Sequence, residues 1–491
     1  MEGEVNNLNS DSTWTVFIRQ LFICVGTIII YFNYGLYFGA PTIFIPQIRR
    51  AANSTDAITL EMESWLSAAV AYSSVPWIII LPVLAYYYGR RIPSLVMWMF
   101  MTASAITLYF SSNVNEILIS QILQGILPAT TTVSALVLTE YTSPKYRGVF
   151  MTLKNATFFW GIWTANVIGT FFHWKVILVP IFTCCAITLT MVFWPESPYW
   201  LADKGRFEEC TTAHRWLKGT NKEAEKELNQ IIGVHMEKIK NRKESSSFKQ
   251  SALKYLRIAR SDVFYKPTLY GMMVSGLYII SGKLTCSIYS IGIINKMTKS
   301  EQAAYFGMLA VDGITIVGMY MGCAISKFVG RRTLLVWTSS VGAFFLFILS
   351  LYFFLINLNI LSENKFISIS FLTLFSMAIS CGPVILGPCI CGELAPLKYR
   401  STFIAVNALL ISLIIGTVIK LSPYAFEYLD LHWSFLIFAC NTAVLTYLVY
   451  RYLPETKDKT LFEIQEQVTG TRLIVQEETT NMLPTDKDVE N

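Results

Sequence analysis

"YYYGRRIPSL" at residues 86–95 and "KFVGRRTLLV" at residues 327–336 place the same Gly-Arg-Arg sequence at two distant points of one chain. Each copy directly follows an apolar stretch, at 62–85 and 303–325, that is long enough to cross roughly 30 Å of hydrocarbon. Glycine permits a tight turn, and arginines mark the cytoplasmic side of membrane helices. We infer that both copies are cytoplasmic turns at equivalent points of two related halves.

A second pair of related sequences supports this division. "LTEYTSPKYRG" at residues 138–148 follows the fourth apolar stretch, and "CGELAPLKYRS" at residues 391–401 follows the tenth. The only long polar segment, residues 196–263, lies between the halves and has the spacing of amphipathic helices. We therefore expect a helical cytoplasmic linker between two six-helix bundles.

The composition places the whole chain in a membrane. Of 491 residues, 53% are hydrophobic and only 15% are charged, and the mean hydropathy is +0.47. This predicts an all-α membrane protein with about twelve transmembrane helices. The expected spans lie near residues 17–39, 62–85, 93–111, 115–139, 149–171, 175–194, 267–293, 303–325, 334–356, 366–391, 402–424 and 432–453.

The positive charges predict the topology. Lysines and arginines crowd alternate connections, so these connections, and with them both termini, are expected in the cytoplasm. The formal net charge of +6 therefore reflects topology, and no nucleic-acid partner is expected. The predicted parts are an N-terminal segment (1–16), a first bundle (17–195), the linker (196–263), a second bundle (264–453) and a C-terminal tail (454–491).

Several motifs together resemble one transporter family. "RQLF" at Arg19, the two Gly-Arg-Arg turns, "PESPYWL" at 195–201 and "PETKDKTLFEI" at 454–464 are similar to the signatures of sugar porters in the major facilitator superfamily. Among these the chain most resembles insect facilitated trehalose transporters. The resemblance implies the major facilitator fold, a location in the cell membrane, and alternating access to a central site for a sugar such as trehalose or a hexose.

Charged residues at the cytoplasmic helix ends are candidates for a gate. Each arginine pair could hold carboxylates of neighbouring helices by bidentate bonds that form when that side is closed. The alternative is that these arginines only fix topology. The residues concerned are Gly89, Arg90, Arg91, Glu140, Arg147, Glu196, Gly330, Arg331, Arg332, Glu393, Arg400 and Glu455. Compared with the family, the acid before each Gly-Arg-Arg turn is replaced, by Tyr86 and Lys327, and an arginine is replaced by Tyr199.

The family resemblance also implies a solute site that this chain has rebuilt. The two glutamines of the family's seventh span correspond to Tyr278 and Ile279 here, and a tryptophan of the eleventh span corresponds to Ser412. Fewer amides and tryptophans remain to match sugar hydroxyls, and an unmatched buried polar group costs about 1–3 kcal/mol. The candidate solute-binding residues are Asn33, Asn155, Tyr278, Ser281, Lys283, Tyr289, Asp312 and Thr315.

Lys283 and Asp312 are charged residues inside apolar stretches. Such charges usually face the bundle interior and pair with each other. Two interpretations stay open: a structural Lys283–Asp312 pair, or a Lys283 ammonium that faces the central cavity and attracts a polar or anionic solute. Lys154, next to Asn155, is expected near the cytoplasmic end in contact with water.

The first span favours passive transport. Proton-coupled sugar porters carry an acid where this chain has Asn33, and no Asp or Glu occurs between Asp11 and Asp56. A uniporter is therefore expected. Three alternatives stay open: a carrier of the same fold for another polar or anionic solute, a sugar sensor that does not transport, and proton-coupled transport through Asp312.

The remaining motifs add little chemistry. The four histidines lack metal-ligand spacing and no phosphate-binding glycine loop is present, so no enzymatic activity, metal or cofactor is expected. The expected partners are a small solute and the lipid bilayer. Asn53 in "NST" is a candidate glycosylation site, and the acidic tail could bind unidentified cytosolic proteins.

Overall fold

A computed structural model of the chain describes residues 13–52, 58–240, 261–396, 399–459 and 461–469. In these parts the chain is entirely helical, with no strand. The helices of the first half are α1 (Thr13–Ala51), α2 (Leu60–Tyr88), α3 (Arg91–Phe110), α4 (Val114–Leu123), α5 (Ile126–Tyr141), α6 (Pro144–Phe171), the short 3₁₀ helix η2 (Trp174–Ile177), α7 (Leu178–Thr188) and η3 (Leu189–Phe193).

Three helices form the described part of the linker: α8 (Pro198–Asp203), α9 (Phe207–Lys218) and α10 (Lys222–Lys240). The second half contains α12 (Asp262–Ile279), α13 (Lys283–Ile288), α14 (Ser290–Thr298), α15 (Glu301–Ile325), α16 (Arg331–Asn357), α17 (Lys365–Ile379), the π-helical turn η4 (Ser380–Val384), α18 (Ile385–Leu394), α19 (Arg400–Tyr428), α20 (Leu431–Tyr452) and the short α21 (Leu461–Thr469). Asn53 and most of the tail, from residue 470 on, lie outside the described residues.

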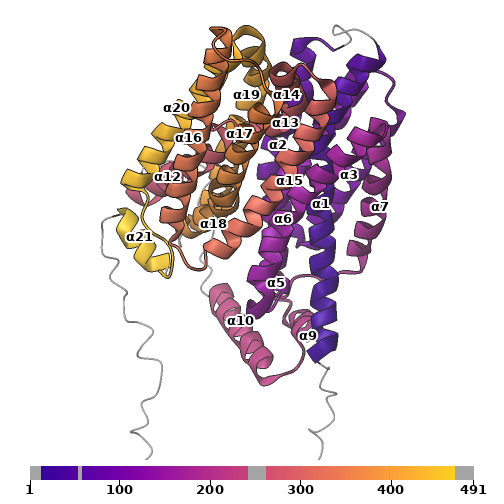
Figure 1. Cartoon of the computed structure of the whole chain (residues 1–491). Helices are drawn as coiled ribbons and strands as arrows, with labels where there is room; N and C mark the ends of the chain where they lie inside the picture. The colour runs from indigo at the N-terminus through magenta and orange to yellow at the C-terminus, as the bar shows by residue number, and fades with distance from the viewer. Residues whose placement is uncertain (1–12, 53–57, 241–260, 397–398, 460, 470–491) are drawn as a thin grey trace, which may run out of the picture.

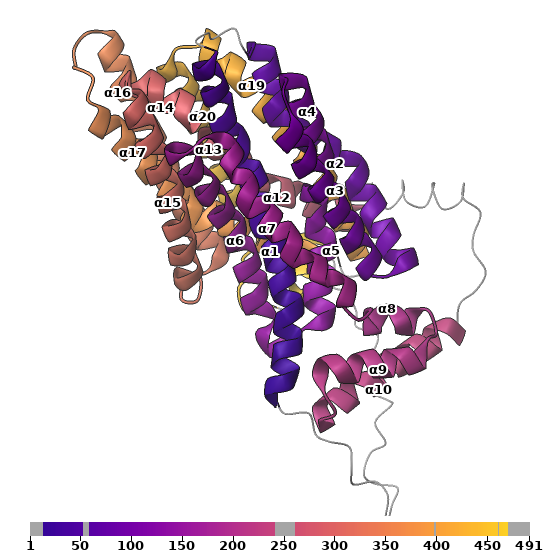
Figure 2. The same cartoon turned by 90° about the vertical axis from the view of Figure 1, so that its right-hand side faces the viewer.

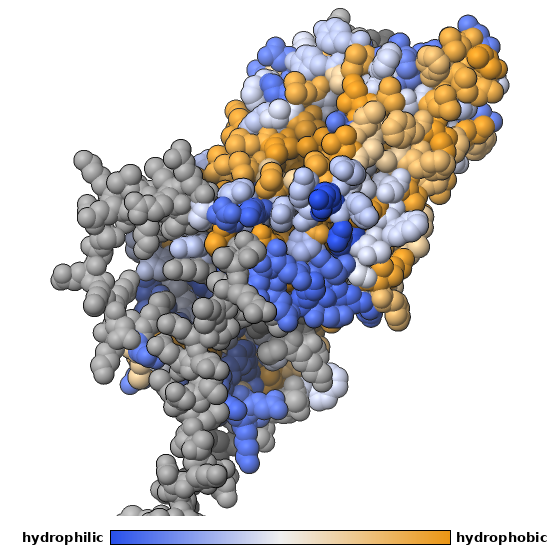
Figure 3. Space-filling model, turned by 90° about the vertical axis from the view of Figure 1, so that its left-hand side faces the viewer, coloured by the Kyte–Doolittle hydropathy of each residue, from blue (hydrophilic) through white to orange (hydrophobic). Residues whose placement is uncertain are grey.

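Eleven helical segments within the described residues are long and apolar enough to cross a membrane. They include every predicted span except the fifth, which corresponds to α6. That helix has 28 residues, but its sequence contains Lys145, Arg147 and Lys154, which lower its hydropathy. Figure 3 shows hydrophobic side chains gathered over the helical bundle and hydrophilic ones towards one end. The predicted all-α membrane fold is confirmed, with six long segments on each side of the linker.

The two halves stand side by side (Figure 1). The linker helices α8, α9 and α10 lie below the first half, and α21 lies below the second half at the same end of the molecule (Figures 1 and 2). We call this the linker end. The linker is fastened to α1, where Arg19 and Gln20 donate hydrogen bonds to the backbone oxygens of Trp216 (3.1 Å) and Leu217 (3.0 Å).

The seventh span is broken, although the sequence predicts one continuous helix. α12 ends at Ile279, and Gly282 adopts a left-handed conformation with φ of 84° before α13 begins at Lys283. An added Cβ at Gly282 would lie 2.6 Å from the Phe438 ring, so only glycine fits this turn. The break places Lys283 at the first position of a new helix inside the bundle.

Two helix pairs make most of the contacts between the halves. Along α2 and α19, Ser74 and Ser412 are hydrogen-bonded at 2.5 Å and Tyr72 contacts Thr417 at 3.2 Å. Along α6 and α15, the Trp160 indole donates to the Tyr320 hydroxyl at 3.2 Å. The small side chains of Ser74 and Ser412 let α2 and α19 approach closely, as is usual for helices within membranes. We call the contact surface along these two helix pairs the seam.

Candidate functional site

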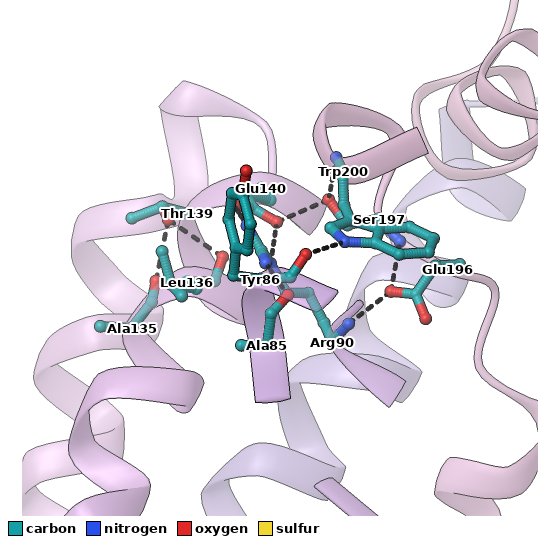
Figure 4. A network of polar contacts seen from close by, with 10 residues as sticks. All are labelled: Ala85, Tyr86, Arg90, Ala135, Leu136, Thr139, Glu140, Glu196, Ser197 and Trp200. Atoms are coloured by element: carbon teal, nitrogen blue, oxygen red, sulfur yellow. Dashed lines mark hydrogen bonds and ion pairs between the residues drawn. The ribbon is translucent and has the colours of Figure 1, made fainter. Parts of the chain in front are cut away.

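Arg90 is the centre of a polar network at the linker end of the first half (Figure 4). Its guanidinium donates to both oxygens of Glu140, at 2.9 and 2.7 Å, in the bidentate geometry that favours arginine over lysine. Its backbone N–H donates to Glu196 at 2.6 Å, and Ser197 donates to Glu140 at 2.5 Å. The network therefore joins the start of α3 to α5 and to the segment that precedes α8.

The second half repeats this arrangement. Arg331 forms an ion pair with Glu393 of α18, and its backbone N–H donates to Glu455 at 2.8 Å. The Arg332 N–H also donates to Glu455, at 3.2 Å. A carboxylate at the start of α16 satisfies free N–H groups and interacts favourably with the helix dipole. Glu196 and Glu455 thus occupy equivalent positions below α3 and α16.

The glycine of each turn makes room for this carboxylate. An added Cβ would lie 2.4 Å from Glu196 at Gly89 and 2.5 Å from Glu455 at Gly330. Gly89 also has a φ of 89°, a backbone conformation that residues other than glycine rarely adopt. The Gly-Arg-Arg sequence is therefore explained locally: glycine admits the carboxylate and the two arginines supply N–H donors.

Each network lies within its own half of the protein. Arg90 contacts residues of the first half, and Arg331 contacts residues of the second. Arg400 is exposed at the start of α19. The side chain of Arg147 lies outside the described residues. No ion pair between the halves occurs at the linker end among the residues that the structure describes.

Tyr86 and Lys327, two positions at which the sequence predicts a departure from the family, make contacts with linker and C-terminal residues. The backbone oxygen of Tyr86 accepts from the Trp200 indole at 2.9 Å, and Lys204 lies over the Tyr86 ring at 4.5 Å. The Lys327 oxygen accepts from Lys457 at 2.8 Å.

Lys283 is buried in the middle of the second half, with 1% of its surface exposed. Its ammonium donates to the Thr315 hydroxyl of α15 at 2.8 Å. Thr315 in turn contacts Ser376 of α17 at 3.0 Å. No carboxylate lies within 4.0 Å of this ammonium among the described residues, and the hydrogen bond that holds it is to the Thr315 hydroxyl.

Asp312 is also buried, at 4% exposed, but its partners are different. Its oxygens accept from Ser287 of α13 at 3.0 Å and from the Asn166 amide at 2.5 Å. Asn166 belongs to α6, so this bond crosses the seam. Lys283 and Asp312 form no direct ion pair, because each is bonded to other partners.

Asn166 is the site residue that the sequence interpretation missed. It is fully buried, and its amide oxygen has no hydrogen-bond partner. The available signal was an amide in an apolar stretch, three residues after Trp163 and six after Trp160. This spacing puts all three on one side of a helix. Together, Asn166, Lys283, Asp312 and Thr315 form the central cluster.

Other predicted solute-binding residues lie near the central cluster or away from it. Ser281 accepts from the Lys283 backbone N–H at 3.4 Å, and Tyr278 is half-buried at the end of α12. Tyr289 donates to the Ile419 oxygen at 3.1 Å. Asn33 is fully buried against Cys185 of α7, inside the first half. Asn155 is half-buried in α6.

Lys154 differs from the expectation. It is buried, at 6% exposed, instead of solvated, and its ammonium lies over the Tyr31 ring at 4.4 Å. The electron-rich face of the ring attracts the ammonium, which makes burial of this lysine possible. The Tyr31 hydroxyl also accepts from Ser134 at 3.2 Å.

A cavity of about 990 Å³ lies at the end opposite the linker. It is lined by residues of α1, α6, η2 and α15, and so lies between the halves. Arg50 and Glu301 form an ion pair across it at 3.2 Å, with 71% and 53% of their side chains exposed. In the described residues no group of three His, Cys, Asp or Glu side chains could hold a metal ion.

The family model described as "Sugar (and other) transporter" matches residues 20–468. The chain belongs to this family. Similar sugar transporter family members include a facilitated trehalose transporter of Bombyx mori, 24% identical over 93% of this chain and 87% of that protein. A probable metabolite transport protein of Bacillus subtilis is 24% identical over 77% of this chain and 80% of that protein.

Solved structures of a sugar transporter share the fold. The inward-open xylose transporter XylE from E. coli has a TM-score of 0.70 and 15% identity, over 92% of this chain and 99% of that one. A partially occluded inward-open structure of XylE has a TM-score of 0.69 and 16% identity, over 91% and 100%. The expected major facilitator fold is thereby confirmed.

Proposed function

We propose that the protein is a facilitative carrier that moves a sugar, trehalose or a hexose, across the cell membrane by alternating access, with both termini in the cytoplasm. The observation that carries this proposal is the central cluster, where polar groups of both halves meet in the interior of a sugar transporter family fold. A solute bound between two halves is exposed to one side at a time when the halves rock.

The Gly-Arg-Arg networks support the proposal that the two halves move relative to each other. They tie the helix ends of each half together at the linker end, so each half can move as one body. The contacts across the seam, such as Ser74–Ser412 and Asn166–Asp312, are the ones that would break and re-form. We propose that Arg90 and Arg331 contact the opposite half only when the linker end closes.

Passive transport is supported by the first helix. α1 contains no Asp or Glu, and Asn33 is buried in a contact with Cys185. A group that does not titrate there cannot carry a proton. We therefore infer uniport, with Asp312 as the acid whose protonation would have to be tested.

A second candidate is supported by Lys283. A buried ammonium without a carboxylate partner is costly in hydrocarbon unless it contacts water, hydroxyls or an anion. In a carrier with a rebuilt site, this ammonium would suit a solute that carries a carboxylate or phosphate. The same alternating access would then move an anionic solute.

Uptake into proteoliposomes tests the first candidate against the second. The full chain would be given labelled trehalose, glucose and glucuronate, with and without a proton gradient. Sugar uptake that is independent of the gradient and shows counterflow supports a sugar uniporter. Glucuronate uptake that falls at least tenfold in Lys283→Met, but not in the exposed control Lys365→Met, supports the anion carrier.

The remaining outcomes overturn parts of the proposal. Uptake that requires the proton gradient contradicts uniport. Binding of a sugar measured by calorimetry, without uptake of any solute by protein shown to be folded and inserted, contradicts transport and leaves a sugar sensor.

A further inference from the structure

Lys283 and Asp312 are opposite charges buried close together without forming an ion pair. Each uses other partners: Thr315 at 2.8 Å for the ammonium, and Ser287 at 3.0 Å and Asn166 at 2.5 Å for the carboxylate. In a low-dielectric interior, opposite charges within reach gain by pairing. A competing partner therefore holds Asp312, and the strongest bond that Asp312 makes outside its own half is to Asn166.

The ammonium is within reach of the carboxylate. Asp312 and Thr315 lie three residues apart on α15, so their side chains occupy adjacent turns roughly 5–6 Å apart. Lys283 has a long flexible side chain and belongs to the same half as both residues. An exchange of Thr315 for Asp312 would therefore need a change of the Lys283 rotamer and no contact with the other half.

The bond to Asn166 depends on the position of the halves. Asn166 lies on α6 of the first half, and its Nδ2 group contacts Asp312 on α15 of the second. The oxygen of the same amide has no hydrogen-bond partner among the residues that the structure describes, so the bond to Asp312 is the one that orients this amide there. When α6 and α15 separate, Asp312 loses a donor and becomes an under-bonded buried carboxylate, which is costly.

We propose that Lys283 alternates between solute and Asp312 under the control of Asn166. In the conformer described here, the Asn166 amide is hydrogen-bonded to the Asp312 carboxylate. The Lys283 ammonium is held by Thr315 and is the group that would bind an oxygen atom of the solute. When the halves rock, Asp312 exchanges Asn166 for Lys283, and the solute loses its cationic partner. This inference rests on the proposed transport function and adds a residue-level mechanism for solute release.

Distances measured between two spin labels at the linker end test the exchange in the absence of solute. Spin labels would be attached through an encoded ketone amino acid at Tyr87 and Phe328, which are 62% and 85% exposed on opposite halves. This chemistry avoids the native cysteines. The full chain in lipid nanodiscs would be compared with Asn166→Ala, Asp312→Asn, Asn166→Ala/Lys283→Met and the exposed control Asn295→Ala.

The two single variants are expected to act in opposite directions. Asn166→Ala removes the bond across the seam and shifts the population roughly tenfold towards the shorter linker-end distance. Asp312→Asn keeps the size of the side chain, but the neutral amide cannot form an ion pair with Lys283. The population with the longer distance between the labels therefore increases. Adding Lys283→Met to Asn166→Ala removes most of the shift, and Asn295→Ala changes nothing.

Two results would overturn the exchange. One is a shift in the same direction for both single variants, as expected of simple structural damage. The other is an Asn166→Ala shift of equal size with and without Lys283. Gel filtration and thermal unfolding identify variants that fail to fold, and nearly isosteric Asp312→Asn keeps the test valid if Asn166→Ala is one of them.

The same labels separate this inference from the proposed function. A transported solute is expected to increase the longer distance in the native chain and to have no effect in Lys283→Met. If the distances follow the exchange but no solute is taken up, transport fails and the exchange stands. If uptake is normal and the distances do not respond to the variants, the exchange fails alone.

Discussion

At the scale of single residues, the turns of this protein depend on glycine and glutamate acting together. Gly89 provides the positive φ and the empty space into which the Glu196 carboxylate reaches. Glu196 then accepts the N–H groups of Arg90 and Arg91, at 2.6 and 3.4 Å. A side chain on residue 89 would displace the carboxylate and strain the backbone at once.

Gly89→Ala is therefore expected to destabilise the protein by about 1–3 kcal/mol. Gly233 of α10 is the matched control, since an added Cβ there meets nothing within 4 Å. Gly233→Ala should be neutral or stabilising by up to about 1 kcal/mol, because alanine favours helix. Thermal unfolding in detergent measures both, and equal melting temperatures for the two variants would contradict the role of Gly89.

At the scale of elements, one carboxylate contacts all three linker helices. Glu227 of α10 accepts from Lys218 at 2.6 Å and from Tyr199 at 2.8 Å, and the His214 ring lies 3.8 Å from it. His214 and these two donors lower the pKa of Glu227 from 4.5 to about 2, against the opposing effect of burial. Tyr199 thus helps to join α8 to α10.

This lowered pKa predicts how linker stability depends on pH. A carboxyl group with a lower pKa in the folded state binds fewer protons when folded, so its stabilisation is complete above pH 4.5 and is lost as pH falls towards 2. Unfolding of the linker, followed at pH 7, 4 and 3, should show a loss of stability in the native chain that is smaller in Glu227→Gln. Exposed Glu237→Gln is the control, and identical pH profiles for all three proteins would contradict the prediction.

At the scale of the whole molecule, the seam decides how the two halves sit. Ser412 is 5% exposed and donates to the Ala71 oxygen at 3.0 Å, in addition to its bond with Ser74. The small residue thus sets the approach of the halves in the conformer described here.

Ser412→Leu is expected to disfavour this conformer, since overpacking costs about 1–3 kcal/mol. Transport should then fall roughly tenfold, because one of the two alternating states is depleted. Thr183→Leu makes a comparable change on an exposed face of α7 and should leave uptake unchanged. Equal uptake by the Ser412→Leu variant and the native chain would contradict this account of the seam.

The sequence by itself determined the membrane fold and its two halves. Span length and hydropathy are local properties that reflect the thickness of the bilayer, and the Gly-Arg-Arg turns depend on neighbours that recur in both halves. The pairing of Arg90 with Glu140 could therefore be expected from residue type alone. The break at Gly282 was missed, because a positive φ depends on the packing of Phe438 against the turn.

Only the tertiary structure decided the partners of the central charges. The sequence placed Lys283 and Asp312 in neighbouring spans and left both a direct pair and a cavity-facing lysine open. The structure joins Lys283 to Thr315 and Asp312 to Asn166 instead. These partners depend on the rotation of each helix about its axis and on the approach of α6 to α15 across the seam. Both are set by packing between segments far apart in the chain, which no local pattern of residues encodes.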